Sequence, residues 1–133
     1  SLVKIFQGLN SKIIISDPTG ENYEYCNKKH TIPKNVFFIT TPHNFSGIIK
    51  ISHCFIRATT TDGDSISVKE SLYFNTPVIA SDCIERAKSV ITYQSQNELS
   101  LKDTISQFKP FITDVKINNG IEDLEKIYDS ILK

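Results

Sequence analysis

Five short apolar runs alternate along the chain with stretches in which apolar residues recur at helical spacing. The runs are rich in β-branched residues and predict buried strands at residues 12–16, 35–40, 54–57, 78–80 and 90–93. The stretches between them predict helices at residues 2–9, 22–30, 45–52, 65–75 and 96–108, and a further helix at 121–132. This alternation indicates an α/β fold, a Rossmann-like doubly wound parallel sheet.

The pattern predicts one domain with a C-terminal extension. Residues 1–108 hold every predicted strand, and residues 109–133 are expected to form a loop and a helix packed on the same domain. A chain of 133 residues is long enough for one domain with a hydrophobic core.

Charge and composition narrow the classes of function. The chain has 15 basic and 15 acidic residues, so its net charge of zero argues against a nucleic-acid partner. No apolar run approaches the roughly 18 residues of a membrane-spanning helix, and no signal peptide is recognisable, so a cytoplasmic location is expected. The cysteines Cys26, Cys54 and Cys83 are odd in number and widely spaced, which disfavours a disulfide framework and a zinc site.

The polar segment at residues 58–65 carries the most chemical information. It contains Gly63 and joins the predicted strand at 54–57 to a predicted helix that opens at Ser65. A helix that begins there directs free backbone N–H groups and the positive end of its dipole toward a ligand, which suits a phosphate group. Glu70 lies five positions, or roughly 7.5 Å, beyond Ser65, within reach of the sugar hydroxyls of a bound nucleotide.

A purely structural interpretation of this segment is also open. Ser65 or Asp64 would then be a helix N-cap, Gly63 a turn residue and Glu70 a surface side chain. The next strand, at residues 78–80, ends in another polar loop, so two neighbouring strands are expected to bring polar loops to one edge of the sheet. That coincidence favours a ligand site.

Residues 58–82 resemble the nucleotide-sugar signature of the family-four retaining glycosyltransferases of the GT-B fold. Those enzymes have a Glu-Gly turn, a second glutamate separated from the first by seven residues, and a Pro-Val-Ile strand that ends in Ser-Asp. Here Asp62 and Gly63 stand in place of Glu-Gly, Glu70 follows, and residues 76–82 read Thr-Pro-Val-Ile-Ala-Ser-Asp. Asp62 departs from the pattern because it is one methylene shorter than glutamate.

The resemblance implies a role for each matching residue. Asp62 would orient the transferred sugar and Glu70 would anchor the ribose, as the catalytic pair. The remaining contacts with the nucleotide-diphosphate sugar are expected from Gly63, Asp64, Ser65, Ile66, Thr40, Pro42 and Arg57. The donor is a substrate, and neither a cofactor nor a metal is expected. The Asp-Gly-Asp variant with Arg57 at the strand end resembles a subgroup associated with bacterial capsule and exopolysaccharide assembly.

The resemblance also implies parts that these 133 residues do not include. A second Rossmann-like domain would hold a saccharide or lipid-linked acceptor, and the whole enzyme would associate with the inner face of the cell membrane. The first strand of such a donor domain precedes the helix at 2–9 and lies mid-sheet. We therefore expect a sheet that is split at this position or completed by another chain, unless residues 2–6 are themselves extended.

Two other functions fit the same residues. Asp62-Gly63-Asp64 is also an Asp-x-Asp sequence, which in the other large glycosyltransferase fold holds a divalent cation on the diphosphate. A non-catalytic module that binds a phosphorylated ligand or a protein partner would have the same order of elements. Arg57 and Arg86 would contact phosphate in a ligand site, or pair with carboxylates in a structural one.

Overall fold

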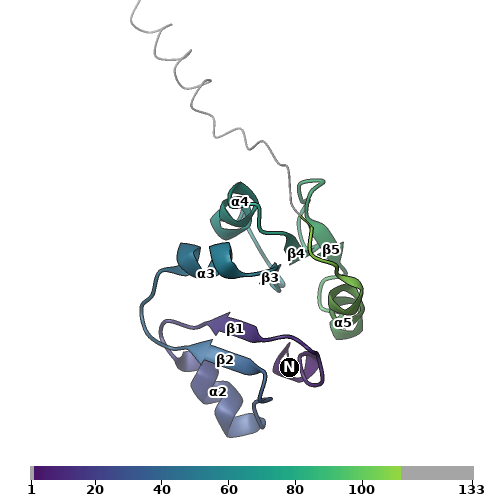
Figure 1. Ribbon diagram of the computed structural model, residues 1–133. Helices are drawn as coiled ribbons and strands as arrows, with labels where there is room; N and C mark the ends of the chain where they lie inside the picture. The colour runs from purple at the N-terminus through teal and green to yellow at the C-terminus, as the bar shows by residue number, and fades with distance from the viewer. Residues whose placement is uncertain (1, 112–133) are drawn as a thin grey trace, which may run out of the picture.

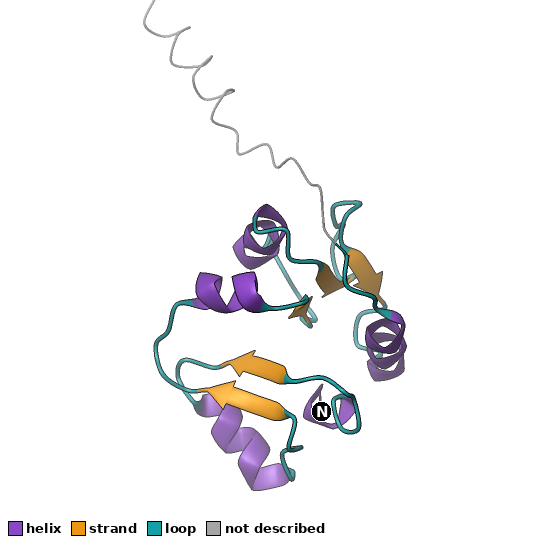
Figure 2. Cartoon of the chain, viewed as in Figure 1, coloured by secondary structure: helices purple, strands orange, loops and turns teal. Residues whose placement is uncertain are grey.

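The computed structural model describes residues 2–111 and has helices alternating with parallel strands (Figure 1, Figure 2). The elements are α1 (Leu2–Ile5), β1 (Ile13–Ser16), α2 (Glu21–Lys29), β2 (Val36–Ile39), α3 (Phe45–Ile51), β3 (Phe55–Arg57), α4 (Ile66–Tyr73), β4 (Val78–Ser81), β5 (Ile91–Tyr93) and α5 (Glu98–Gln107). Each strand lies within one residue of a predicted run, so the predicted order of strands is confirmed. The expected helix at 121–132 lies outside the described residues.

The first helix is shorter than the sequence pattern predicts. α1 ends at Ile5 because the chain turns there: the Leu9 N–H donates to the Phe6 carbonyl at 3.3 Å, and Gly8 has a φ of 83°. A left-handed conformation of this kind is readily adopted by glycine and interrupts a helix. The prediction of a helix over residues 2–9 is therefore wrong in its second half.

A single side chain holds this turn against the sheet. Asn35 Nδ2 lies 2.9 Å from the Phe6 carbonyl oxygen, 3.3 Å from that of Leu9 and 3.0 Å from that of Ser11. Asn35 directly precedes β2, so its amide joins the connection between α1 and β1 to the start of the neighbouring strand.

The strands form two parallel sheets, which agrees with the expectation of a split sheet. β1 pairs with β2 in one sheet, and β4 lies between β3 and β5 in the other. Figure 1 shows β1 on the side of β2 that faces β3, yet no ladder joins β1 to β3. The interruption falls where the resemblance leads us to expect an additional strand, and residues 2–5 are helical, not extended.

The core of the three-stranded sheet lies on both faces of β4. Val78 and Ala80 pack with Val68 and Leu72 of α4, whereas Ile79 packs with Tyr93 and, from α1 and α5, with Ile5 and Leu101. Successive residues of a strand point to opposite faces, so the alternation places α4 on one face and α1 with α5 on the other. All four residues of β4 are buried, as the sequence predicts for a central strand.

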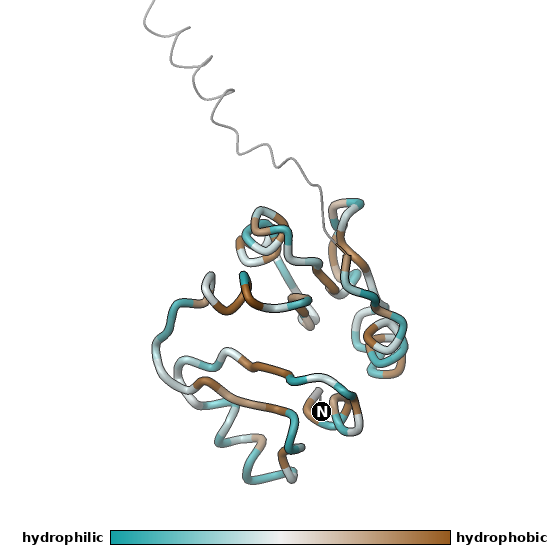
Figure 3. The backbone as a smooth tube through the Cα atoms, viewed as in Figure 1, coloured by the Kyte–Doolittle hydropathy of each residue, from teal (hydrophilic) through white to brown (hydrophobic). Residues whose placement is uncertain are grey.

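The two-stranded sheet is covered less completely. The Tyr23 ring of α2 meets the Phe38 ring of β2 edge to face, with ring centroids 5.4 Å apart. Ile14 and Phe37 are partners in the ladder and are both exposed. Figure 3 shows the apolar character of β1 and β2.

α4 has a defined C-terminal end. The Thr76 N–H donates to the Ser71 carbonyl and the Asn75 N–H donates to the Leu72 carbonyl, while Asn75 has a φ of 58°. These two bonds and the left-handed residue form a Schellman motif. The Thr76 hydroxyl then donates to the Ile49 carbonyl of α3 at 3.0 Å, which joins the two helices.

Among residues 2–111 no helix combines the length and the apolar character needed to cross a lipid bilayer.

Candidate functional site

The loops that follow β3 and β4 meet at one edge of the three-stranded sheet. The two strands are parallel neighbours, and Arg57 at the end of β3 is opposite Ala80 of β4. Beyond the strands, the Ser81 hydroxyl donates to the Thr59 carbonyl at 2.6 Å. The prediction that neighbouring strands bring polar loops to the same edge is confirmed for these two loops.

Asp62 lies between two arginines at this edge. Arg57 Nη2 is 3.2 Å from Asp62 Oδ1 and Arg57 Nε is 3.3 Å from Oδ2, which is a two-point contact. From the loop after β4, Arg86 Nη2 donates to Asp62 Oδ2 at 3.0 Å. Only 4% of the Asp62 side chain and 4% of the Arg86 side chain are exposed, whereas Arg57 is 37% exposed.

The arginines hold the pKa of Asp62 below its ordinary value. The hydrogen bond from Arg57 is the largest cause, and it acts together with the hydrogen bond from Arg86 against the opposing effect of burial. Asp62 is therefore ionised at neutral pH and neutralises one of the two cations. One positive charge remains, and Arg57 is the more exposed of the two arginines.

Arg86 is a packed structural residue as well as an ion-pair partner. Its Nε donates to the Ser81 carbonyl at 3.0 Å, and its Nη2 lies 3.8 Å from Cys83 Sγ. These contacts join the loop after β4 to Asp62 in the loop after β3. Of the two interpretations of Arg86, the ion pair is the one that the structure bears out.

α4 begins at the same edge without a side-chain cap. Ser65 is its N-cap residue, yet the Ser65 hydroxyl bonds to the Ser67 hydroxyl at 3.0 Å and caps no backbone N–H. By contrast, α3 is capped by Asn44 and α5 by Asn97. The backbone N–H groups of Ile66 and Ser67 have no acceptor among residues 2–111. The prediction that this helix begins within two residues of Asp64 is confirmed.

The residues around this helix start are open to solvent. A Cβ added to Gly63 would meet nothing within 4 Å, so the backbone there can be approached closely. Asp64 is exposed and forms an ion pair with Lys69. Ile66 is 80% exposed, because Val68 and Leu72 are the apolar residues of α4 that face the core.

Glu70 lies half-buried where α4 meets α3. It accepts a hydrogen bond from the hydroxyl of Ser46, in the first turn of α3. Glu70 is half-buried, which agrees with a position at the margin of the apolar face of α4, whereas Tyr73, three residues further along the helix, is exposed. Its carboxylate has accepting positions left for a ligand hydroxyl, since a carboxylate offers about four.

Thr40 and Pro42 lie in the loop that follows β2. Both are exposed and follow β2, which belongs to the two-stranded sheet. No hydrogen bond or ion pair within residues 2–111 connects either of them to residues 62–65. In the same loop, His43 Nε2 lies 3.1 Å from Ser16 Oγ at the end of β1.

Sequence reasoning missed the role of Asp17. Asp17 is buried, and its two oxygens accept hydrogen bonds from Asn22 Nδ2 and the Tyr23 N–H, each at 2.8 Å. Burial alone would raise its pKa, yet these hydrogen bonds outweigh that effect and the pKa is lowered. The signal in the sequence is weak, because Asp17 stands three positions before the N-cap residue Gly20, where a capping side chain is usually found.

The Asp-x-Asp alternative receives no support from the geometry. Asp62 faces Arg57 and Arg86, while Asp64 faces Lys69 on the outside of the helix. Within residues 2–111 no cluster of three or more His, Cys, Asp or Glu side chains is arranged to hold a metal ion.

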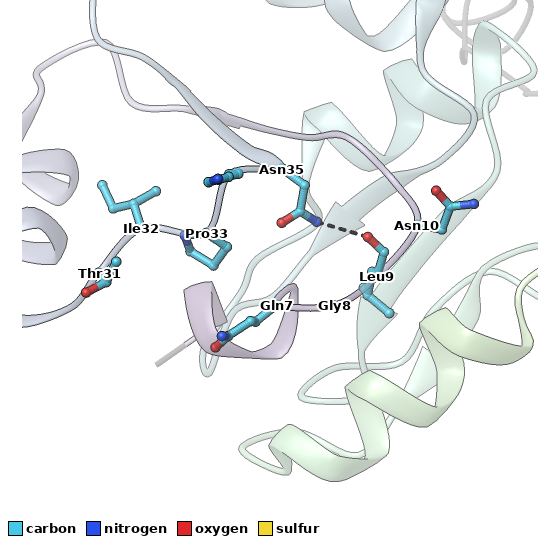
Figure 4. Close-up of a pocket in the computed structure, with 9 residues that line it drawn as sticks. Gln7, Gly8, Leu9, Asn10, Thr31, Ile32, Pro33 and Asn35 are labelled. Atoms are coloured by element: carbon cyan, nitrogen blue, oxygen red, sulfur yellow. Dashed lines mark hydrogen bonds between the residues drawn. The ribbon is translucent and has the colours of Figure 1, made fainter.

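A shallow depression of about 570 Å³ lies at the amino ends of the strands of the two-stranded sheet (Figure 4). It is formed by the turn after α1 and the segment before β2, with the lining residues Gln7, Gly8, Leu9, Asn10, Thr31, Ile32, Pro33, Lys34 and Asn35. Ligands of open α/β sheets bind beyond the carboxyl ends of the strands, and this depression lies at the amino ends.

No family model matches the chain, and neither a curated protein nor a solved structure shows significant similarity to it.

Proposed function

We propose that this chain is the donor-binding domain of a retaining glycosyltransferase of the GT-B type. It would take a sugar from a nucleotide-diphosphate sugar and pass it to a growing bacterial polysaccharide, with the saccharide or lipid-linked acceptor held by a second domain at the inner face of the membrane. The main support is the uncapped start of α4, which presents two free N–H groups at the end of the loop that begins with Arg57. The resemblance of residues 58–82 to the nucleotide-sugar signature supports it independently.

In this proposal the chemistry is electrostatic and positional. Negative charge accumulates on the leaving diphosphate as the bond to the sugar breaks. The N–H groups of Ile66 and Ser67 and the guanidinium of Arg57 would stabilise that charge without having to move. Glu70 would accept hydrogen bonds from the ribose and fix the position of the nucleotide.

The proposed contact of Asp62 with the transferred sugar needs a change in its present bonding. Both Asp62 oxygens accept from arginines, so a sugar hydroxyl would have to share an oxygen with Arg57 or Arg86. The same observation favours a second candidate, a non-catalytic module that binds a phosphorylated ligand. In that module Asp62 would only hold Arg57 in place.

A nuclear magnetic resonance titration tests the shared step, which is phosphate binding. Uridine and guanosine diphosphates and inorganic pyrophosphate are added separately to the labelled 133-residue chain, and amide shifts are followed. We expect concentration-dependent shifts at the amides of Gly63, Ile66 and Ser67. The amides of Gly47 and Ser100, which are occupied by the Asn caps of α3 and α5, serve as internal references. No shift at the α4 amides with millimolar ligand would rule out both candidates.

A matched pair of variants identifies the donor groups. Ile66→Pro removes one N–H, and proline is well tolerated at the first position of a helix. Ser65 has a φ of −59° and a ψ of 116°, which suits a residue before proline. Ile66→Ala removes the exposed side chain but keeps the N–H. We expect about a fivefold or greater loss of diphosphate affinity in Ile66→Pro relative to Ile66→Ala, the equivalent of one hydrogen bond.

A further inference from the structure

Two shallow depressions adjoin each other at the amino end of β2. The first, of about 570 Å³, lies between the turn after α1 and the segment before β2 (Figure 4). The second, of about 770 Å³, lies between that segment and α2. Both are lined by residues 31–34, so together they form one open surface, the α2–β2 trough, made of residues 7–10, Tyr23 and residues 27–36.

The trough has positive charge without a carboxylate in its wall. Lys28 and Lys29 lie in the last turn of α2 and Lys34 lies in the segment before β2, and all three are exposed. None of the described residues that line the trough is aspartate or glutamate. The whole chain has 15 basic and 15 acidic residues, so this local excess departs from the composition of the molecule. A surface of one sign attracts ligands of the opposite sign.

The charge of these lysines is available to a ligand. Lys29 Nζ donates to the Tyr25 hydroxyl at 3.2 Å, a contact that leaves the ammonium charge in place. Lys28 lies 3.8 Å from Glu24, but the two side chains are 77% and 72% exposed, so this ion pair is weak. The Lys34 ammonium has neither an ion pair nor a hydrogen bond within residues 2–111. Lysines in a last turn also offset the helix dipole, but Lys34 lies outside the helix.

The rest of the lining suits a ligand that has both hydroxyl groups and apolar faces. Ile32 and Pro33 are half-buried and supply apolar surface, whereas Gln7, Asn10 and Thr31 are exposed and supply amide and hydroxyl groups. Figure 4 shows Thr31 and Asn10 at opposite ends of the first depression, so a ligand that reached both would be extended. A sugar ring has C–H groups on its faces and hydroxyl groups at its rim, which matches this combination.

We propose that the α2–β2 trough binds an acidic oligosaccharide, a chain of sugar units that carry carboxylates. Lys28, Lys29 and Lys34 would pair with the carboxylates, and the amide and hydroxyl groups would bind the sugar hydroxyls. A lipid surface fits less well, because Ile32 and Pro33 are half-buried and a membrane contact needs apolar side chains that protrude. The trough lies at the amino end of β2, whereas the proposed donor site follows the carboxyl ends of β3 and β4, so this inference does not depend on the proposed glycosyl transfer.

A nuclear magnetic resonance titration of the labelled 133-residue chain tests the proposal. The probe is tetragalacturonate, and the matched neutral probe is maltotetraose, which has the same number of sugar units and no carboxylate. We expect concentration-dependent shifts at the amides of Gly8, Thr31 and Lys34 with tetragalacturonate and none with maltotetraose. The amides of Ile66 and Ser67, at the start of α4, report separately on the proposed donor site.

Two triple variants with the same change in net charge show whether the trough lysines are responsible. Replacement of Lys28, Lys29 and Lys34 by glutamine should weaken tetragalacturonate binding about tenfold or more, because each contact with a carboxylate is charge-assisted. Replacement of the exposed lysines 88, 102 and 109 by glutamine should change it less than about twofold. The amide spectrum of β4 shows whether each variant is folded.

The remaining results would each overturn the proposal. Equal losses in the two triple variants would mean a general attraction between the chain and an anion. Equal or tighter binding of tetraglutamate at the same amides would mean a site for an acidic peptide, and equal binding of maltotetraose would mean that charge is not recognised. No shift with millimolar tetragalacturonate would mean that the trough is not a saccharide site. Shifts at the trough with diphosphate-silent α4 amides would uphold this inference and reject the proposed function, and the reverse pattern would do the opposite.

Discussion

Asp62 is the counter-charge of two arginines, Arg57 and Arg86. Removing its carboxylate in Asp62→Ala would leave Arg86 buried without its counter-charge, so we expect the free energy of unfolding to fall by about 3 to 5 kcal/mol. The control is Asp103→Ala on the exposed side of α5, which should change stability by less than about 0.5 kcal/mol. Urea unfolding of both variants measures the difference. A loss for Asp62→Ala no larger than the control's would mean that the arginines find other partners.

Glu70 and Asp62 should differ in what they contribute to an intact enzyme of the proposed kind. Glu70→Gln keeps the shape that accepts the Ser46 hydroxyl but removes the charge, so we expect nucleoside diphosphate affinity to fall by roughly 1.5 to 3 kcal/mol. Asp62→Asn should leave that affinity nearly unchanged and lower turnover, because its proposed contact is with the sugar.

Calorimetry with the nucleoside diphosphate, beside a turnover assay, separates these two roles. Glu85→Gln, an exposed carboxylate in the loop after β4, serves as the control for Glu70. Equal losses of diphosphate affinity in Glu70→Gln and Asp62→Asn would refute the division of roles. No loss in either variant would favour the non-catalytic module.

At the scale of single elements, the end of α4 depends on a left-handed residue. Asn75 has a φ of 58°, which glycine adopts without strain and a β-branched residue does not. Asn75→Gly should therefore leave stability unchanged or raise it by up to about 1 kcal/mol, and Asn75→Val should lower it by about 1 to 2 kcal/mol.

Asn27, exposed in the last turn of α2, provides a control for which the expected change in stability has the opposite sign. Asn27→Gly should destabilise the protein by a few tenths of a kcal/mol, since glycine is a poorer helix former than asparagine. Thermal unfolding of the three variants checks the order. A gain in stability from Asn27→Gly equal to that from Asn75→Gly would mean that backbone geometry is not the cause.

The sequence predicted the elements better than their connections. The strands were found because β-branched runs such as residues 12–16 are a local signal, and the start of α4 because a polar loop precedes it. The short α1 was missed because Asn35, which fixes the turn after it, is distant in sequence. The pairing of Asp62 with Arg86 joins residues 24 positions apart, and spacing along the chain carries no signal for such a contact.

For the molecule as a whole, two carboxylates make the free energy of unfolding fall as the pH is lowered. The pKa values of Asp17 and Asp62 are both lowered in the folded protein, so the unfolded chain takes up protons first as the pH falls. The stabilisation is complete above the ordinary aspartate pKa of about 4 and is lost as the pH falls through the lower folded values.

The free energy of unfolding, measured between pH 7 and pH 2, should show this loss. Its slope against pH should be smaller in Asp17→Asn than in the parent chain. The exposed Asp103→Asn should keep the parent's slope. If all three slopes agree, other carboxylates account for the acid sensitivity.

Asn35 also sets how the protein would age chemically. Its amide has two hydrogens and lies against three carbonyl oxygens, those of Phe6, Leu9 and Ser11. Spontaneous deamidation would convert it to aspartate, which can only accept hydrogen bonds when ionised and would set a negative charge against all three carbonyls. Hydrolysis of this one amide would therefore release the turn after α1 from β2.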